Sequence, residues 1–175
     1  MRHYQPTVLL LLGLLSFIFA CKGGLNGMFT ADYNGEPFSG DGRIKNSRPT
    51  NNADLQTFTF YSEVRRGNVI AEGLRFKFIT AEEGTYSLRR VPVPVTPDSE
   101  FPTATMTTLL SGGDIAGPIY HLLESDSLTN TFTIDQAKSN WVSGTFNVTL
   151  VTTGSQFVEA DTVRLTNGSF TARYD

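Results

Sequence analysis

The feature that most constrains the fold is an apolar–polar alternation with a period of two residues, which recurs along the chain. It is cleanest from Val142 to Val151, where the residues of one parity are Val142, Gly144, Phe146, Val148 and Leu150. Successive side chains of a β-strand point to opposite faces of the sheet, so this pattern predicts a half-buried strand. No long stretch shows the 3.6-residue period of an amphipathic helix.

The same alternation predicts several further strands. The stretches 57–64, 74–79 and 131–137 alternate, and we expect them to turn these apolar residues inward: Phe58, Phe60 and Val64; Leu74, Phe76 and Phe78; Phe132 and Ile134. The stretch 103–110 is expected to return as an edge strand. The stretch 115–124 fits neither a strand nor a helix well, because Gly117-Pro118 interrupts it, and both remain open.

Turn residues set further details of the chain. Asn34-Gly35 is a pair suited to a tight hairpin. The polar stretch from Asp41 to Asp54 is predicted to be a loop around a short strand at residues 43–45. In the last strand, 162–174, the apolar parity switches at Asn167-Gly168, which predicts a β-bulge there.

Eight or nine strands joined by short turns, with no helices between them, indicate an all-β fold. We predict that residues 29–175 form one domain, an antiparallel β-sandwich, with an up-and-down, lipocalin-like barrel as the alternative. The length suits a single domain with a real hydrophobic core.

The amino-terminal segment has the composition of a cleavable leader. An apolar run from Val8 to Phe19 follows Arg2 and ends at the small residue Ala20. The run is too short to cross a bilayer as a helix, which takes about 20 residues. Residues 1–20 are therefore predicted to be a signal peptide.

Cys21 is the only cysteine of the chain, so it cannot form an internal disulfide. The preceding residues Ile18-Phe19-Ala20 give a sequence that resembles the bacterial lipobox. That resemblance implies cleavage between Ala20 and Cys21 and lipidation of Cys21. Residues 21–28 would then be a lipidated cysteine and a glycine-rich tether. Lys22 in place of an aspartate resembles the pattern that permits sorting to the outer membrane, on either its periplasmic face or the cell surface.

Several short motifs follow one another along the rest of the chain. They are Phe-Thr-Ala-Asp-Tyr-Asn-Gly (29–35), Gly-Thr-Tyr-Ser-Leu (84–88), Val-Ser-Gly-Thr-Phe-Asn-Val (142–148) and Val-Arg-Leu-Thr-Asn-Gly-Ser-Phe (163–170). Their order after a lipobox resembles that of small lipoproteins of Bacteroidota, which carry F-x-A-x-x-N-G, G-T-Y, S-G-T-F and T-N-G-x-F motifs. The resemblance covers nearly all of the mature chain. It implies a lipid-anchored, all-β envelope protein and brings no catalytic residues.

The inventory of reactive side chains is thin. His121 is the only histidine outside the leader, and the single cysteine is assigned to the lipid, so a zinc site of three or four His and Cys ligands is excluded by count. The chain has neither a nucleophile elbow nor a phosphate-binding glycine loop. We therefore expect a non-enzymatic protein with no catalytic residues, metal or cofactor. The net charge of −3 and the absence of a basic run in the sequence predict no nucleic-acid partner.

The alternative function is a module that binds a glycan, a lipid or an envelope protein. Trp141, Tyr120 and His121 are the candidate contact residues, because aromatic rings stack on sugars and carry a polar group as well. Two short sequences, Asp126-Ser127-Leu128 and Asp161-Thr162-Val163, resemble the acceptor motif for O-glycosylation of exported Bacteroidota proteins. That resemblance implies Ser127 and Thr162 as possible glycosylation sites.

Overall fold

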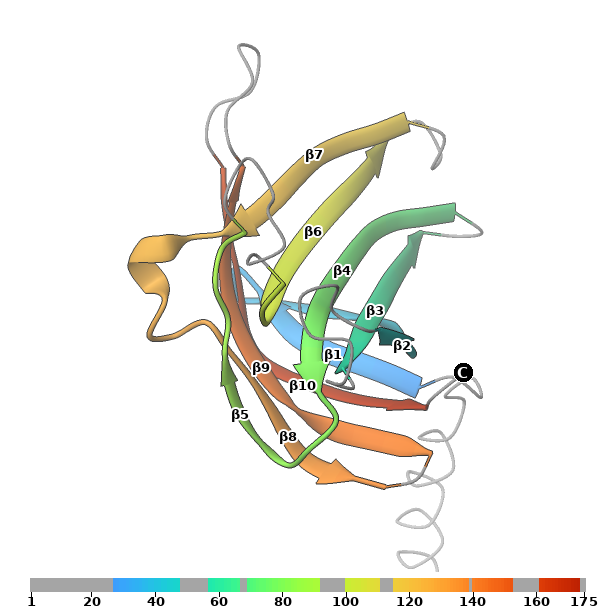
Figure 1. Ribbon diagram of the computed structural model, residues 1–175. Helices are drawn as coiled ribbons and strands as arrows, with labels where there is room; N and C mark the ends of the chain where they lie inside the picture. The colour runs from blue at the N-terminus through green and yellow to red at the C-terminus, as the bar shows by residue number, and fades with distance from the viewer. Residues whose placement is uncertain are drawn as a thin grey trace, which may run out of the picture.

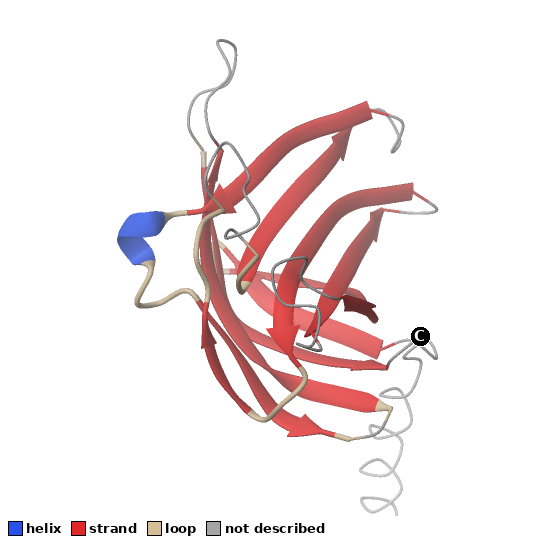
Figure 2. Cartoon of the chain, in the orientation of Figure 1, coloured by secondary structure: helices blue, strands red, loops and turns tan. Residues whose placement is uncertain are grey.

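The strands that the structure describes pair into one antiparallel sheet. The computed structural model describes residues 27–47, 57–66, 69–91, 100–110, 115–138, 140–152 and 161–173. The strands in these ranges are β1 (Gly27–Tyr33), β2 (Glu36–Ser47), β3 (Thr57–Arg66), β4 (Val69–Thr80), β5 (Gly84–Ser87), β6 (Thr103–Leu110), β7 (Ile115–Leu122), β8 (Thr131–Ala137), β9 (Trp141–Thr152) and β10 (Thr162–Arg173). One short 3₁₀ helix, η4 (Glu124–Asp126), follows β7, and Figure 2 shows it as the single helical turn in the described part of the chain.

The sheet closes on itself as a barrel (Figure 1). The strand order is β10-β1-β2-β3-β4-β6-β7-β9, and β10 pairs with β9 to complete the ring. Barrel strands that are neighbours in space follow one another in sequence, apart from the excursions to β5 and β8, so the topology is up-and-down. The prediction of an antiparallel all-β fold is confirmed, whereas the sandwich is wrong and the up-and-down barrel fits. The reason is the β10–β1 ladder, which joins the two halves of the sheet into one ring, so the strands do not separate into two facing sheets.

Strand β9 has two successive partners along one of its edges. It pairs with β8 up to Asn147 and with β7 from Leu150 onward, and β5 extends the sheet beyond β8. The side chain of Asn130, which is 1% exposed, fills the gap between these two ladders. Its Oδ1 accepts the Thr149 N–H at 2.8 Å, and its Nδ2 donates to the Leu123 carbonyl at 3.1 Å. The Asn130 side chain thus makes the hydrogen bonds to β9 and its neighbour that a partner strand would make elsewhere along β9.

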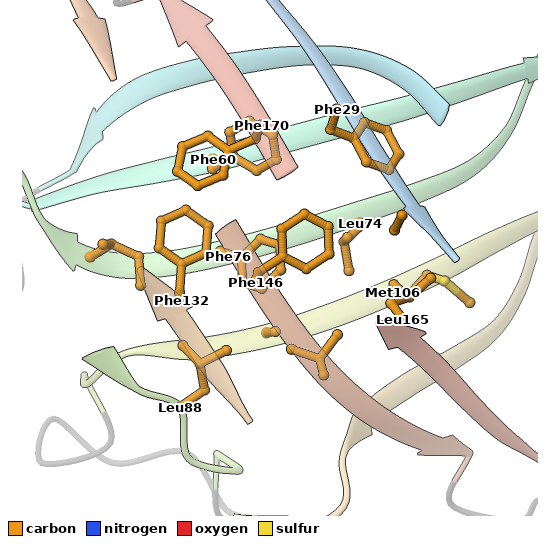
Figure 3. Packing of buried hydrophobic residues seen from close by; sticks show 14 of the residues in the cluster. Phe29, Phe60, Leu74, Phe76, Leu88, Met106, Phe132, Phe146, Leu165 and Phe170 are labelled. Carbon is orange, nitrogen blue, oxygen red and sulfur yellow. The ribbon is translucent and has the colours of Figure 1, made fainter. Parts of the chain in front are cut away.

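The middle of the barrel is filled by phenylalanine. In the described ranges, seven phenylalanines are at most 3% exposed: Phe29, Phe58, Phe60, Phe76, Phe132, Phe146 and Phe170. Figure 3 labels all of them except Phe58 and shows the labelled rings gathered between the strands; the closest centroids, those of Phe132 and Phe170, are 4.5 Å apart. The buried hydrophobic residues of the described ranges lie between Phe29 and Ala172, so a chain of residues 22–175 contains this whole core.

Inward-facing glycines make room for these rings. Gly40 is paired with Phe29, Gly168 with Phe146 and Gly144 with Phe170 across neighbouring strands. A Cβ atom at Gly168 would come within 2.5 Å of the Phe146 ring, and one at Gly40 within 2.7 Å of the Phe29 ring. Each large ring therefore packs over a glycine, which has no side chain, and this lets the rings fit inside a narrow barrel.

Two predicted local features are confirmed. The β1–β2 hairpin turns at Asn34 and Gly35, whose φ angles are 50° and 92°. The register of β10 against β9 shifts between Leu165 and Gly168, and Asn167 has a φ of 52°, so the predicted bulge lies where the apolar parity changes. Residues 174 and 175 lie outside the described residues.

Strand β4 departs from its predicted pattern near its end. Phe78 was expected to face inward, but it is only partly buried, and Ile79 is fully buried instead. Phe78 has a φ of 56°, and the register against β3 shifts between Phe58 and Phe60. A bulge here inserts one extra residue, which reverses the side-chain alternation after it.

The remaining strands also differ from the sequence-based expectations. β6 is not an edge strand, because it pairs with β4 on one side and β7 on the other. The ambiguous stretch forms β7, and Pro118 lies at its register shift against β6, where the absence of an N–H is tolerated. β2 runs without a break to Ser47, so the short strand predicted inside a loop is the end of a long one.

Strand β1 begins at Gly27, two residues before the predicted start of the domain. The predicted signal peptide, Ala20, Cys21 and the first residues of the tether lie outside the described residues. In the ranges that the structure describes, no helix has the length and apolar character needed to span a bilayer.

Candidate functional site

One end of the barrel carries a layer of polar and aromatic side chains above the phenylalanine core. It is the end where β1, β3, β6 and β9 finish and β2, β4, β7 and β10 begin, and the arrowheads of β3 and β6 in Figure 1 point to it. We call this end the mouth. Its inward-facing residues continue the inward parity of their strands and are Tyr33, Phe38, Val64, Glu72 and Tyr120.

A cavity of about 410 Å³ opens at the mouth. Tyr33 and Phe38 form an aromatic wall, with ring centroids 5.3 Å apart and planes tilted by 46°. The lining is completed by Glu36, Pro37, Ser39, Val64 and Glu72. The volume falls in the range of pockets that hold small molecules.

Tyr120 is buried beside this cavity and is 6% exposed. Its hydroxyl donates to Oδ2 of Asp161 at 3.2 Å. Asp161 is held in turn by Thr152, whose hydroxyl accepts the Asp161 N–H at 3.0 Å. Burial, and then the charge of Asp161 and its hydrogen bond, raise the pKa of Tyr120 to about 12, with smaller contributions from Tyr33 and Glu72. The Tyr120 hydroxyl therefore stays protonated at physiological pH.

The electrostatic character of the mouth is acidic. Glu36, Glu72 and Asp161 place carboxyl groups there, and no lysine or arginine is among the described residues that line the cavity. An aromatic wall beside carboxylates suits a ligand that offers C–H faces together with hydroxyl or ammonium donors. A phosphate or a carboxylate would be repelled. In the described ranges, no three His, Cys, Asp or Glu side chains gather closely enough to hold a metal ion.

The three contact residues predicted from the sequence lie in different places. Tyr120 is at the mouth, whereas His121 is on the opposite face of β7, outside the barrel and half-buried. Burial and then the positive charge of Arg90 lower the pKa of His121. Trp141 begins β9 at the end of the barrel away from the mouth, paired with Arg173, and is also half-buried. Of the three, only Tyr120 lies at the mouth, beside the cavity and not in its lining.

The two predicted O-glycosylation residues differ in accessibility. Ser127 is exposed directly after η4, at the edge of a second cavity of about 400 Å³ that Leu88, Arg90 and Phe101 also line. Thr162 is half-buried at the start of β10, where it pairs with Val151. The hydroxyl of Ser127 is the more accessible of the two.

Comparison of the chain with protein-family models, with curated proteins and with solved structures finds no match. The functional argument therefore depends on the geometry of the barrel. Sequence reasoning missed Tyr33, Phe38 and Glu72. The signal that could have found Glu72 is its parity: it shares the inward register of Leu74 and Phe76 but carries a charge.

Proposed function

We propose that this chain is a non-enzymatic lipoprotein of the bacterial cell envelope, tethered through Cys21, whose barrel binds a small polar ligand at its mouth. The observation that supports the proposal most strongly is the cavity beside Tyr33, Phe38 and Glu72, at the end of a barrel whose middle is packed with phenylalanine. A ligand is held at such a mouth rather than deep in the barrel.

The ligand class follows from the lining. A neutral or amine-bearing sugar presents C–H faces to an aromatic wall and donates hydrogen bonds to carboxylates. Glu72, in the lining beside the aromatic wall, would accept hydrogen bonds from the ligand, and Tyr120 lies close to Glu72. A lipid chain fits less well, because it needs an apolar channel in the space that the phenylalanine rings occupy.

The position of β1 supports a consistent orientation on the membrane. β1 begins at Gly27, at the end of the barrel opposite the mouth. Five residues, 22–26, separate it from Cys21, and a glycine-rich segment of that length has a root-mean-square reach of roughly 11–13 Å. A lipid on Cys21 would hold the opposite end near the bilayer and turn the mouth away from it.

The ligand proposal is tested by thermal unfolding of residues 22–175 with neutral sugars, amino sugars and uronic acids. A ligand at 100 times its dissociation constant adds about 2.7 kcal/mol of stability. That corresponds to roughly 5–10 °C in Tm for a domain of this size. All of these ligands are monosaccharides, and we expect a shift with the neutral or amino sugars and none with a single uronic acid.

The variant Glu72→Gln should shrink the shift, whereas Asp135→Asn, which changes an exposed carboxylate of β8, should leave it unchanged. Stabilisation by uronic acids alone, or an equal shift in Glu72→Gln, would show that the mouth is not the site proposed.

The anchor is tested separately in the full chain by Cys21→Ala. We expect the wild-type protein to fractionate with membranes and to incorporate labelled fatty acid, and the variant to do neither. A Cys21→Ala protein that still pelleted with the outer membrane would disprove the lipoprotein assignment.

A further inference from the structure

The outer surface of β2, β3 and β4 concentrates positive charge. Arg43 and Lys45 from β2, Arg65 from β3 and Arg75 from β4 have the outward parity of their strands. Arg43, Tyr61 and Arg75 lie opposite one another across the three strands. We call these four cations, with Tyr61 and Glu63 between them, the basic face.

Two side chains of β3 hold the four cations in place. Arg43 and Arg65 both donate to Oε2 of Glu63, at 3.1 and 3.2 Å. Arg75 lies over the ring of Tyr61 at 4.8 Å from its centroid, and the Lys45 ammonium lies 5.9 Å from it. The basic face itself has four positive charges and one carboxylate. The outward residues next to it, Asp41 of β2 and Lys77 of β4, cancel each other, so its net charge stays about +3 in a chain whose total is −3.

A hollow of about 280 Å³ adjoins the basic face. Its lining includes Tyr61, Glu63 and Arg75, together with Thr105 and Thr107 of β6. Gly73 lines it as well, and a Cβ atom there would meet nothing nearer than the Ser62 carbonyl at 3.8 Å. The hollow therefore offers two hydroxyls and the Arg75 guanidinium next to open space, with the Glu63 carboxylate, which Arg43 and Arg65 already engage, at its side.

We propose that the basic face binds an acidic polysaccharide, one that carries carboxylate or sulfate groups. The cations come from three adjacent strands about 4.8 Å apart, so they span about 10 Å or more. That spread suits a chain with several anionic groups better than a single anion. Holding the arginines and the lysine before binding reduces the entropy lost when the ligand docks.

Two other polyanions fit the basic face less well. Single-stranded nucleic acid binds largely by stacking bases on aromatic rings, but two cations already flank the Tyr61 ring. An anionic membrane is favoured by apolar side chains that insert beside the charges. The large hydrophobic residues exposed in the described ranges are Met28, Ile119 and Leu128, which lie on β1, on β7 and after η4.

The test measures binding of residues 22–175 to polygalacturonate and dextran sulfate over a range of salt concentrations, with neutral dextran as the negative control. The variant Arg43→Gln/Arg75→Gln removes two of the four cations. Each engaged cation contributes about 0.7–0.9 to the slope of log K against log salt. The variant should therefore make the salt dependence less steep, by roughly 1.4–1.8 in the magnitude of the slope, and weaken binding about 5- to 30-fold at moderate salt.

The matched control is Arg164→Gln/Arg173→Gln, which makes the same change of net charge at two exposed arginines of β10. This control should bind as the wild type does. Equal losses in the two variants would reduce the effect to net charge and overturn the proposal, as would no binding at low salt. Tighter binding to single-stranded DNA or to phosphatidylglycerol vesicles than to both polysaccharides would overturn it as well. The mouth plays no part in this test, so the basic face and the ligand at the mouth stand or fall separately.

Discussion

Replacing Gly168 with alanine should destabilise the barrel by overpacking its core. The new Cβ would lie 2.5–2.6 Å from three atoms of the Phe146 ring, closer than real side-chain contacts allow. That ring cannot simply turn away, because Phe146 is 1% exposed and its centroid lies 5.0 Å from that of Phe76. Overpacking of this kind typically costs 1–3 kcal/mol. With both rings buried, we expect about 2–3 kcal/mol, or a fall in Tm of roughly 4–12 °C.

The assay is urea unfolding of residues 22–175, followed by circular dichroism. Gly73→Ala is the matched control, because its Cβ would have open space and its cost should stay within about 0.5 kcal/mol. In a Phe146→Leu background the smaller side chain should absorb much of the clash, so Gly168→Ala should cost less than about 1 kcal/mol. An equal cost of Gly168→Ala with either residue at position 146 would refute the steric account.

Three further changes test the polar groups. Asn130→Ala should cost about 1–3 kcal/mol in the free energy of unfolding, because it leaves the buried Thr149 N–H without a partner, whereas the Leu123 carbonyl keeps its bond from the Asp126 N–H. Asn147→Ala, which removes an exposed side chain-to-backbone bond, should cost less than about 1 kcal/mol. The pKa of Tyr120 is raised from 10.0 to about 12, so between pH 10 and 12 the unfolded chain releases the Tyr120 proton before the folded chain does. The free energy of unfolding of the wild type should therefore fall by on the order of 1–2 kcal/mol over this range, and that of Tyr120→Phe should not. The pKa of His121 is lowered, so the neutral imidazole stabilises the folded state above pH 6.5, and this stability is lost as the pH falls below that value. Arg90→Gln should raise the pKa of His121 in an NMR titration and make the stability depend less on pH in this range.

Local alternation predicted most of the strands because it reports directly on which side chains are inward. The five residues of apolar parity from Val142 to Leu150 are all buried in β9, and the parity switch at Asn167-Gly168 located the bulge in β10. Where a bulge had no such signal, the prediction failed. Phe78 and Ile79 are both apolar, so the sequence does not show which of them faces the core.

Closure of the sheet depends on pairings between distant residues, which alternation does not specify. Gly27 and Ala172 pair across almost the whole chain to join β1 to β10, and a sandwich would place the same residues inward. The glycines opposite Phe29 and Phe146 are a weak indication of a barrel, because inward glycines beside large rings suit a narrow, tapered interior. Their meaning emerges only when the register is known.

The two candidate sites were hidden for a related reason: the net charge of the chain averages over surfaces of opposite sign. On β4, Glu72 points into the mouth and Arg75 points out to the basic face, so one strand contributes to both. The wall between them is a single sheet, and the alternation that buries the core also sorts the charges to its two sides. The sequence does carry this signal, in Arg43 and Lys45 on β2 and in Arg75 and Lys77 on β4, each pair two residues apart. Residues two apart along a strand lie on the same face, so each pair places two positive charges outside the barrel and none in its interior, where the mouth is acidic.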